Sequence, residues 1–152
     1  MVPLRSLFGT ILVLHLFWSS IASAGTQGYG NVVVDTVTTI YDGDTFRATI
    51  NDWPPIIGKN IPIRVNGIDT PEMRGGCREE IEQARKAKQE AVAMIRAAKV
   101  VELRNINRDK YFRIVADVYL DGKSLGDSLI GKGLAKTYDG GKKEKWCLFS
   151  TK

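Results

Sequence analysis

The stretch that decides the fold reads Ile61-Pro62-Ile63-Arg64-Val65-Asn66-Gly67-Ile68-Asp69-Thr70-Pro71-Glu72. Its first five residues are mostly apolar and predict a strand. Gly67 permits a bend, and Thr70-Pro71 requires an extended residue followed by a rigid turn. We therefore expect Arg64 on the strand, and Asp69 and Glu72 on the loop that leaves it. Loops held by a strand commonly carry reacting groups, so the stretch is a candidate site, with a charged surface turn as the alternative.

The N-terminal residues have the composition of a targeting segment. Arg5 gives a basic start, residues 7–18 are almost entirely apolar, and Ala22-Ser23-Ala24 supplies small residues. This pattern predicts a secretory signal peptide, residues 1–24, cleaved after Ala24. The apolar run is shorter than the roughly 20 residues that span a bilayer, although an uncleaved anchor is the alternative.

Cleavage would leave a chain of one domain's length. We expect residues 25–30 to form a flexible, glycine-rich lead-in and residues 31–152 to form the domain. The mature protein would have no stable membrane anchor and would be exported, to a periplasm or outside the cell.

Charge and cysteine content narrow the class of protein. The formal net charge is +5 and falls to +4 without Arg5, and the pI is near 9.3. A basic chain suits a polyanionic partner, although positive charge also aids solubility. In an oxidising compartment, Cys77 and Cys147 predict one disulfide, which would stabilise the fold by about 2–4 kcal/mol. Two free thiols are the alternative.

The single histidine, His15, lies in the predicted signal peptide. The mature chain would therefore have no imidazole, which excludes Ser-His-Asp and Cys-His catalysis and a histidine zinc site. Proton transfer and metal binding are left mainly to carboxylates. Carboxylates combined with carbonyls suit hard cations such as calcium.

The order of the expected elements indicates the fold class. Residues 31–41, the turn Asp42-Gly43 and residues 45–50 predict a hairpin, and residues 51–60 a loop. Apolar positions three or four apart predict a helix over residues 78–99. Residues 100–106 and 112–120 predict two strands, Ser124 begins a short helix, and residues 134–138 are extended. This order predicts an α+β, mainly β domain: a five-stranded OB-fold barrel with one long and one short helix.

Three sequence blocks, in this order, identify a family resemblance. They are Tyr41-Asp-Gly-Asp-Thr45, Arg64-Val-Asn-Gly-Ile-Asp-Thr-Pro-Glu72 and Asp109-Lys-Tyr-Phe-Arg113. Followed by Gly133-Leu-Ala135, they make residues 32–138 resemble the staphylococcal nuclease (thermonuclease) family. The resemblance implies an OB-fold barrel that hydrolyses DNA and RNA with calcium and low sequence specificity, leaving 3′-phosphate ends.

The resemblance also implies a role for each matching residue. Ca²⁺ would be bound by Asp44, Asp69 and the backbone carbonyl of Thr70, with Asp42 close to the metal. The residues implied in catalysis are Arg64 and Arg113, which would bind the scissile phosphate, and Glu72, the general base. The residues implied in contacts with a flanking phosphate are Lys110, Tyr111 and Tyr138.

The chain departs from the family pattern in three places, one of which is a longer loop between the second and third strands, with Trp53 and two prolines. Phe112 stands where the family usually has a glycine, and the long C-terminal helix of the family is cut short after Gly141. A link between Cys77 and Cys147 would replace the packing of that helix. The competing functions are a non-catalytic nucleic-acid-binding module and an envelope scaffold, and magnesium is the alternative metal. We expect DNA and RNA as partners and a monomeric protein.

Overall fold

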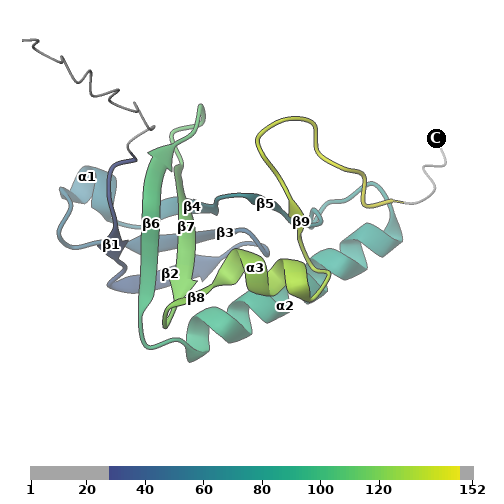
Figure 1. Ribbon diagram of the computed structural model, residues 1–152, viewed down its shortest axis with the longest axis horizontal. Coiled ribbons are helices and arrows are strands. Elements are labelled where there is room, and N and C mark those ends of the chain that lie inside the picture. The colour runs from purple at the N-terminus through teal and green to yellow at the C-terminus, as the bar shows by residue number, and fades with distance from the viewer. Residues whose placement is uncertain (1–27, 148–152) are drawn as a thin grey trace, which may run out of the picture.

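The computed structural model describes residues 28–147 (Figure 1). The predicted signal peptide, residues 1–24, and half of the predicted lead-in, residues 25–27, lie outside the described residues. Within residues 28–147, no helix has both the length and the apolar character needed to cross a membrane.

The chain folds into short strands and helices of very different lengths. The strands are β1 (Val32–Val33), β2 (Thr36–Ile40), β3 (Thr45–Thr49), β4 (Ile61–Val65), β5 (Ile68–Asp69), β6 (Val101–Arg108), β7 (Ile114–Leu120), β8 (Lys123–Ser124) and β9 (Lys136–Thr137). The helices are α1 (Pro55–Gly58), α2 (Arg78–Ala97) and α3 (Leu125–Gly131). The strands with five or more residues are β2, β3, β4, β6 and β7, which correspond to the five predicted strands. The mainly β OB fold with one long and one short helix is confirmed.

One curled sheet contains most of the strands, in the order β1-β6-β7-β4-β3-β2, with β8 added on β7. The pairing of β4 with β7 is parallel, and the other pairings are antiparallel. Residues 32–40 form hydrogen bonds at both edges of this sheet, with β6 at one edge and with β3 at the other. The amide of Val34 donates to the carbonyl of Val101, the first residue of β6, at 2.9 Å, and the amide of Asp35 donates to the carbonyl of Thr49 on β3, at 3.0 Å. One extended segment therefore joins the two edges of the curled sheet.

Helix α2 packs against the sheet through small side chains. Ala84, Ala87 and Ala91 are fully buried on one face of the helix, as the spacing predicted. Gly43, in the turn between β2 and β3, lies so close that a Cβ there would meet Thr70 Cγ2 at 2.8 Å and Ala87 Cβ at 3.0 Å. This close approach requires glycine, and it places the Asp42–Asp44 turn beside the loop that follows β5.

Several predicted boundaries are wrong. Strand β7 begins at Ile114, not at residue 112, because Phe112 has φ of 62° and lies in the turn between β6 and β7. Asp109 causes this turn, since its Oδ1 accepts the amides of Tyr111 at 2.8 Å and Arg113 at 3.0 Å. The predicted loop over residues 51–60 contains the short helix α1, whose first residue is Pro55.

The C-terminal segment takes the place of a helix. After β9 it loops outward and returns to the N-terminal end of α2 (Figure 1). Residues 138–147 contain no helix, in agreement with the predicted loss of the family's C-terminal helix. Cys147 is disulfide-bonded to Cys77, the residue before α2, so the predicted pairing is confirmed.

Candidate active site

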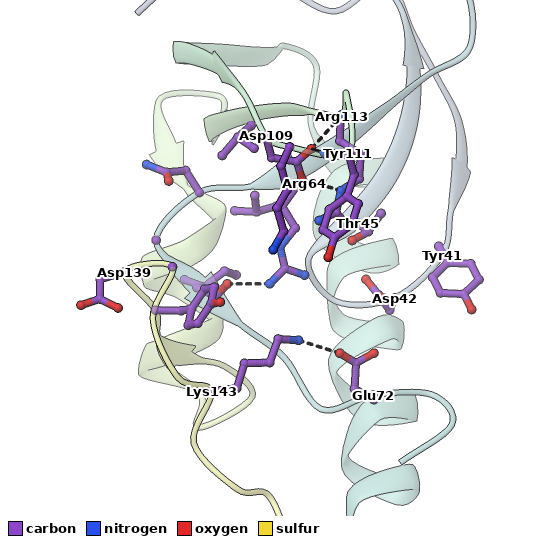
Figure 2. Close-up of a pocket in the computed structure, with 18 residues that line it drawn as sticks. Tyr41, Asp42, Thr45, Arg64, Glu72, Asp109, Tyr111, Arg113, Asp139 and Lys143 are labelled. Carbon is purple, nitrogen blue, oxygen red and sulfur yellow. Dashed lines mark hydrogen bonds and ion pairs between the residues drawn. The ribbon is translucent and has the colours of Figure 1, made fainter. Parts of the chain in front are cut away.

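An open pocket of about 790 Å³ lies beside the turn between β6 and β7, between β4 and the C-terminal segment (Figure 2). The predicted site residues that line it are Asp42, Arg64, Glu72, Lys110, Tyr111, Arg113 and Tyr138. The three predicted metal ligands, Asp44, Asp69 and Thr70, do not line the pocket and are almost fully buried. The predicted residues from three separate sequence blocks are thus brought to one place.

Asp44 is the most deeply buried carboxylate of the site, with 1% of its surface exposed. Its Oδ1 accepts the hydroxyl of Thr45 at 3.0 Å, and its Oδ2 accepts both the amide of Thr70 at 2.8 Å and the hydroxyl of Thr70 at 3.0 Å. Because a buried carboxylate is costly without such partners, the hydrogen bonds stabilise the charge and fix its orientation.

Arg64 joins the two buried carboxylates. It projects from β4, with its side chain 13% exposed, and its Nη1 pairs with Asp44 Oδ1. Its Nη2 lies 3.4 Å from Asp69 Oδ1 and donates to the carbonyl of Ile68 at 3.2 Å. The planar guanidinium can hold both partners because its donors lie in a fixed fork. The same side chain faces the pocket, where it can reach a bound anion.

A second cation lies between Asp69 and Glu72. Lys143 Nζ is 2.8 Å from Asp69 Oδ1 and 2.7 Å from Glu72 Oε1. In Figure 2 Lys143 points from the C-terminal segment toward Glu72. Burial lowers the pKa of Lys143, but hydrogen bonds to Asp69 and Glu72 outweigh it, so the pKa lies above its ordinary value. Lys143 is therefore charged at neutral pH.

The pocket wall opposite Glu72 contains Arg113. Its Nε donates to Asp109 Oδ2 at 2.8 Å, and its guanidinium lies 5.5 Å from the centre of the Tyr111 ring. Lys110 Nζ lies 5.2 Å from the same ring. Arg113 and Lys110 thus place positive charge on the wall formed by the turn between β6 and β7, as a phosphate-binding site requires.

The surroundings of Asp42 shift the pKa of its carboxyl group. Burial, together with the charge of Asp44, raises the pKa of Asp42 from 3.8 to about 7. Asp42 Oδ1 accepts the amide of Asp44 at 3.1 Å, and this bond fixes the turn that carries both residues. Asp42 therefore supports the position of Asp44.

The donor set fits a hard divalent cation. Asp44 and Asp69 supply two buried carboxylates, Thr70 supplies a backbone carbonyl, and all of these donors are oxygens, which calcium prefers. In this structure the ammonium of Lys143 lies against Asp69. In the described part of the chain, three His, Cys, Asp or Glu ligand atoms converge only at Cys77, Glu80 and Cys147, where both thiols are used in the disulfide.

Comparisons with known proteins agree with this geometry. Residues 62–149 match the family described as staphylococcal nuclease homologue. The chain belongs to this nuclease family. The match contains Arg64, Asp69, Glu72 and Arg113, and it begins after the turn that carries Asp44.

Individual relatives are named as nucleases. Endonuclease YncB of Bacillus subtilis is 34% identical over 104 residues, which cover 66% of this chain and 46% of that protein. The SPbeta prophage-derived endonuclease YokF of the same organism is 35% identical over 104 residues, covering 66% and 33%. Staphylococcal-like nuclease CAN1 of Arabidopsis thaliana is 30% identical over 83 residues, covering 55% and 24%. The chain spans less than half the length of each of these relatives.

The structure of this nuclease-family domain adds three residues that the sequence analysis did not single out for the site. Glu80, buried in the first turn of α2, accepts the amides of Glu72 at 3.3 Å and Gly76 at 2.9 Å. Lys143 contacts Asp69 and Glu72, and Trp146 Nε1 donates to Asp69 Oδ2 at 3.3 Å. Lys143 and Trp146 lie 71 residues or more from their partners, so spacing carried no signal for them, whereas Glu80 lies within eight residues of both of its partners. The one available signal was the position of Lys143 and Trp146 just before Cys147.

Proposed function

We propose that this chain is an exported, calcium-dependent nuclease that hydrolyses phosphodiester bonds of DNA and RNA with low sequence specificity and leaves 3′-phosphate ends. One observation carries the proposal. Arg64, Glu72 and Arg113 line a single pocket, and Arg64 also pairs with the buried carboxylates Asp44 and Asp69. Hydrolysis of a phosphodiester requires positively charged groups in contact with the phosphate, and beside them a base that accepts the proton of the attacking water.

The two arginines would bind the scissile phosphate. A guanidinium can donate two parallel hydrogen bonds to phosphate oxygens, and its charge stabilises the negative charge that builds on phosphorus. Arg113 is 33% exposed at its side chain, and its contact with Asp109 uses Nε, which leaves the two Nη groups for a phosphate. Lys110, Tyr111 and Tyr138 line the same pocket and would contact the flanking phosphate.

Glu72 would accept the proton of the attacking water. As the water oxygen bonds to phosphorus, the bond from phosphorus to the 5′ oxygen breaks, the 5′ oxygen takes a proton from solvent and leaves as a hydroxyl, and the phosphate stays on the 3′ end. Glu72 lines the pocket and is 53% exposed at its side chain, so it can meet a water molecule. General-base help of this kind contributes roughly 10²–10⁴ to a rate.

Asp44, Asp69 and the Thr70 carbonyl would hold Ca²⁺. When bound, calcium would supply positive charge to a phosphate oxygen. The all-oxygen donor set on loops favours the flexible coordination of calcium over the strict octahedron of magnesium.

Cleavage of plasmid DNA and of RNA, with calcium or with chelator, tests the proposal. We expect cleavage with calcium, none with chelator, and a loss of roughly 10²-fold or more in Glu72→Gln. Glu82→Gln, on the exposed side of α2, is the matched control and should cleave at the wild-type rate. Wild-type cleavage by Glu72→Gln would exclude Glu72 as the base.

A non-catalytic nucleic-acid-binding module is the competing function. The ion pairs that neutralise Asp44 and Asp69 favour it, because they occupy the carboxylates that the metal would need. A gel-shift measurement that shows binding to DNA, with no cleavage at any calcium concentration, would support this alternative.

Export rests on the sequence of residues 1–24 and on the disulfide between Cys77 and Cys147, which suits an oxidising compartment. Mass spectrometry of the protein recovered outside the cytoplasm should find an N-terminus at Gly25. A mass that begins at Met1 would contradict cleavage.

A further inference from the structure

The segment that follows β9, residues 138–147, is held at both ends beside the proposed cation site. We refer to it as the C-terminal strap. At its start, β9 pairs with β5, and Lys136 lies opposite Asp69. At its end, Cys147 is disulfide-bonded to Cys77. The strap therefore begins next to one carboxylate of the site and ends beside the loop that carries Glu72.

Two side chains of the strap contact the carboxylates directly. Lys143 Nζ lies 2.8 Å from Asp69 Oδ1 and 2.7 Å from Glu72 Oε1. Trp146 Nε1 donates to the other oxygen of Asp69, at 3.3 Å. Both oxygens of Asp69 thus have partners on the strap, although 74 and 77 residues separate them in sequence.

Lys136, on β9, contacts the strap residues between Lys143 and Cys147. Its Nζ donates to the carbonyl of Lys145 at 2.9 Å, pairs with Glu144 at 3.3 Å and lies 4.6 Å from the centre of the Trp146 ring. Three contacts from one side chain fix the strap between Lys143 and Trp146, which keeps their contacts with Asp69 in register.

The ammonium of Lys143 would compete with a divalent cation for the Asp69 carboxylate. A divalent cation bound to Asp69 would lie a few ångströms from the ammonium, and two positive charges at that distance repel strongly where water is partly excluded. Binding of the cation therefore requires the ammonium to leave. The same departure frees Glu72, whose oxygen the ammonium occupies.

We propose that the C-terminal strap is a built-in competitor of the cation, in which Lys143 occupies the position between Asp69 and Glu72 and Trp146 positions the Asp69 carboxylate. The inference rests on the proposed function, because it assumes that Asp69 binds the cation. The disulfide keeps Lys143 at a high local concentration, which for a short tether is roughly millimolar. The strap thus sets the calcium concentration at which the site fills.

The expected change in the calcium Kd depends on the fraction of molecules in which Lys143 does not occupy the site. An apparent Kd rises by the inverse of that fraction, so a strap engaged in about nine molecules of ten weakens cation binding roughly tenfold. Removing the ammonium should therefore tighten calcium binding by about that factor.

Calorimetric titration of the disulfide-bonded protein with calcium alone, without nucleic acid, tests the proposal. We expect Lys143→Met to lower the calcium Kd roughly tenfold. Lys142→Met removes the same charge from the neighbouring position, which has no carboxylate partner among the described ion pairs, and should change the Kd less than twofold. Lys143 is 42% exposed at its side chain, so the substitution leaves the core intact.

The tether is tested by a second pair of variants. Cys77→Ser/Cys147→Ser releases the strap, so adding Lys143→Met to that pair should change the calcium Kd less than it does in the disulfide-bonded protein. Terbium, an ion that takes calcium sites and emits when a nearby indole absorbs light, reports on Trp146. Emission should fall in Trp146→Phe and persist in Lys143→Met.

The calcium titrations distinguish a failure of the competitor role of Lys143 from a failure of the proposed function. A calcium Kd in Lys143→Met equal to that of the wild type, with measurable binding in both, would overturn the competitor and leave the proposed function standing. Absence of calcium binding in the wild type and in Lys143→Met would overturn both, because the carboxylates would then hold no cation with or without the strap.

Discussion

Asp109 Oδ2 lies 2.8 Å from Arg113 Nε, and its Oδ1 accepts the amide of the same residue at 3.0 Å. One carboxylate therefore fixes both the backbone and the guanidinium of the arginine that we propose for phosphate binding. In Figure 2 this pair lies on the side of the pocket away from Glu72.

We expect Asp109→Ala to disorder the turn and to slow cleavage by roughly tenfold, since lost orientation of a phosphate ligand reduces the rate without removing the charge. The lost hydrogen bonds should lower the free energy of unfolding by about 1–2 kcal/mol. Steady-state kinetics and urea denaturation measure the two effects. Asp127→Ala, on the exposed side of α3, should retain the wild-type rate.

Asp109 should also make the stability of the fold depend on pH. Burial raises the pKa of Asp109, but hydrogen bonds from Arg113 and Tyr111 prevail, and the pKa lies below its ordinary value of 3.8. A lowered folded-state pKa adds stability above the unfolded-state pKa, and this stability is lost as the pH falls through the folded-state value. Asp109→Asn should therefore lose less stability than the wild type on acidification below about pH 4, as measured by thermal melting.

Phe112 is expected to strain the turn. Its φ of 62° is unfavourable for a side chain with a Cβ, and its ring is 76% exposed, so little burial offsets the cost. Phe112→Gly should raise the free energy of unfolding by up to about 1 kcal/mol, after the extra flexibility of glycine in the unfolded chain is included. Phe112→Ala keeps the strain and is the control. Equal stability of the two variants in urea would show that φ is not the cause.

Glu80 should position the loop that carries Glu72. A Cβ at Gly75 would lie 2.5 Å from Glu80 Cδ, whereas a Cβ at Gly76 meets nothing closer than Cys147 Sγ at 3.9 Å. We expect Gly75→Ala to displace Glu80, to speed hydrogen exchange at the Gly76 amide and to reduce cleavage. Gly76→Ala is the matched control. Slow exchange in Gly75→Ala would show that Glu80 does not hold the loop.

Arg64 and Arg113 should be more sensitive than a surface arginine to replacement by lysine. Lysine keeps the charge and loses the paired hydrogen bonds, so Arg64→Lys and Arg113→Lys should each lower kcat by roughly 10²-fold. Arg78→Lys, at a side chain that is 88% exposed, should leave kcat unchanged. Similar kcat values for all three variants would argue that neither pocket arginine meets the reacting phosphate.

The fold could be predicted wherever the local pattern and the tertiary structure agree. Alternating or periodic apolar residues identified β4 and α2, and the turn residues Asp42-Gly43 identified the hairpin. The start of β7 was mispredicted because the apolar alternation in the sequence extends to Phe112, while the side chain of Asp109 forms a turn there. A hydrogen bond from a backbone amide to a side-chain carboxylate leaves no trace in the hydropathy pattern.

The site was predicted in part for a similar reason. The sequence blocks identified Arg64, Asp69 and Glu72, and the structure brings them together. Lys143 and Trp146 were missed because their contacts depend on the path of the chain after β9, which the disulfide directs. Contacts made across 70 residues or more cannot be read from spacing.

The extended segment over residues 32–40 hydrogen-bonds to both edges of the curled sheet. Loss of that segment by proteolysis would uncover two rows of backbone donors and acceptors at once, on β3 and on β6. Exposed strands of this kind recruit other chains, so loss of residues 32–40 would favour association of domains edge to edge.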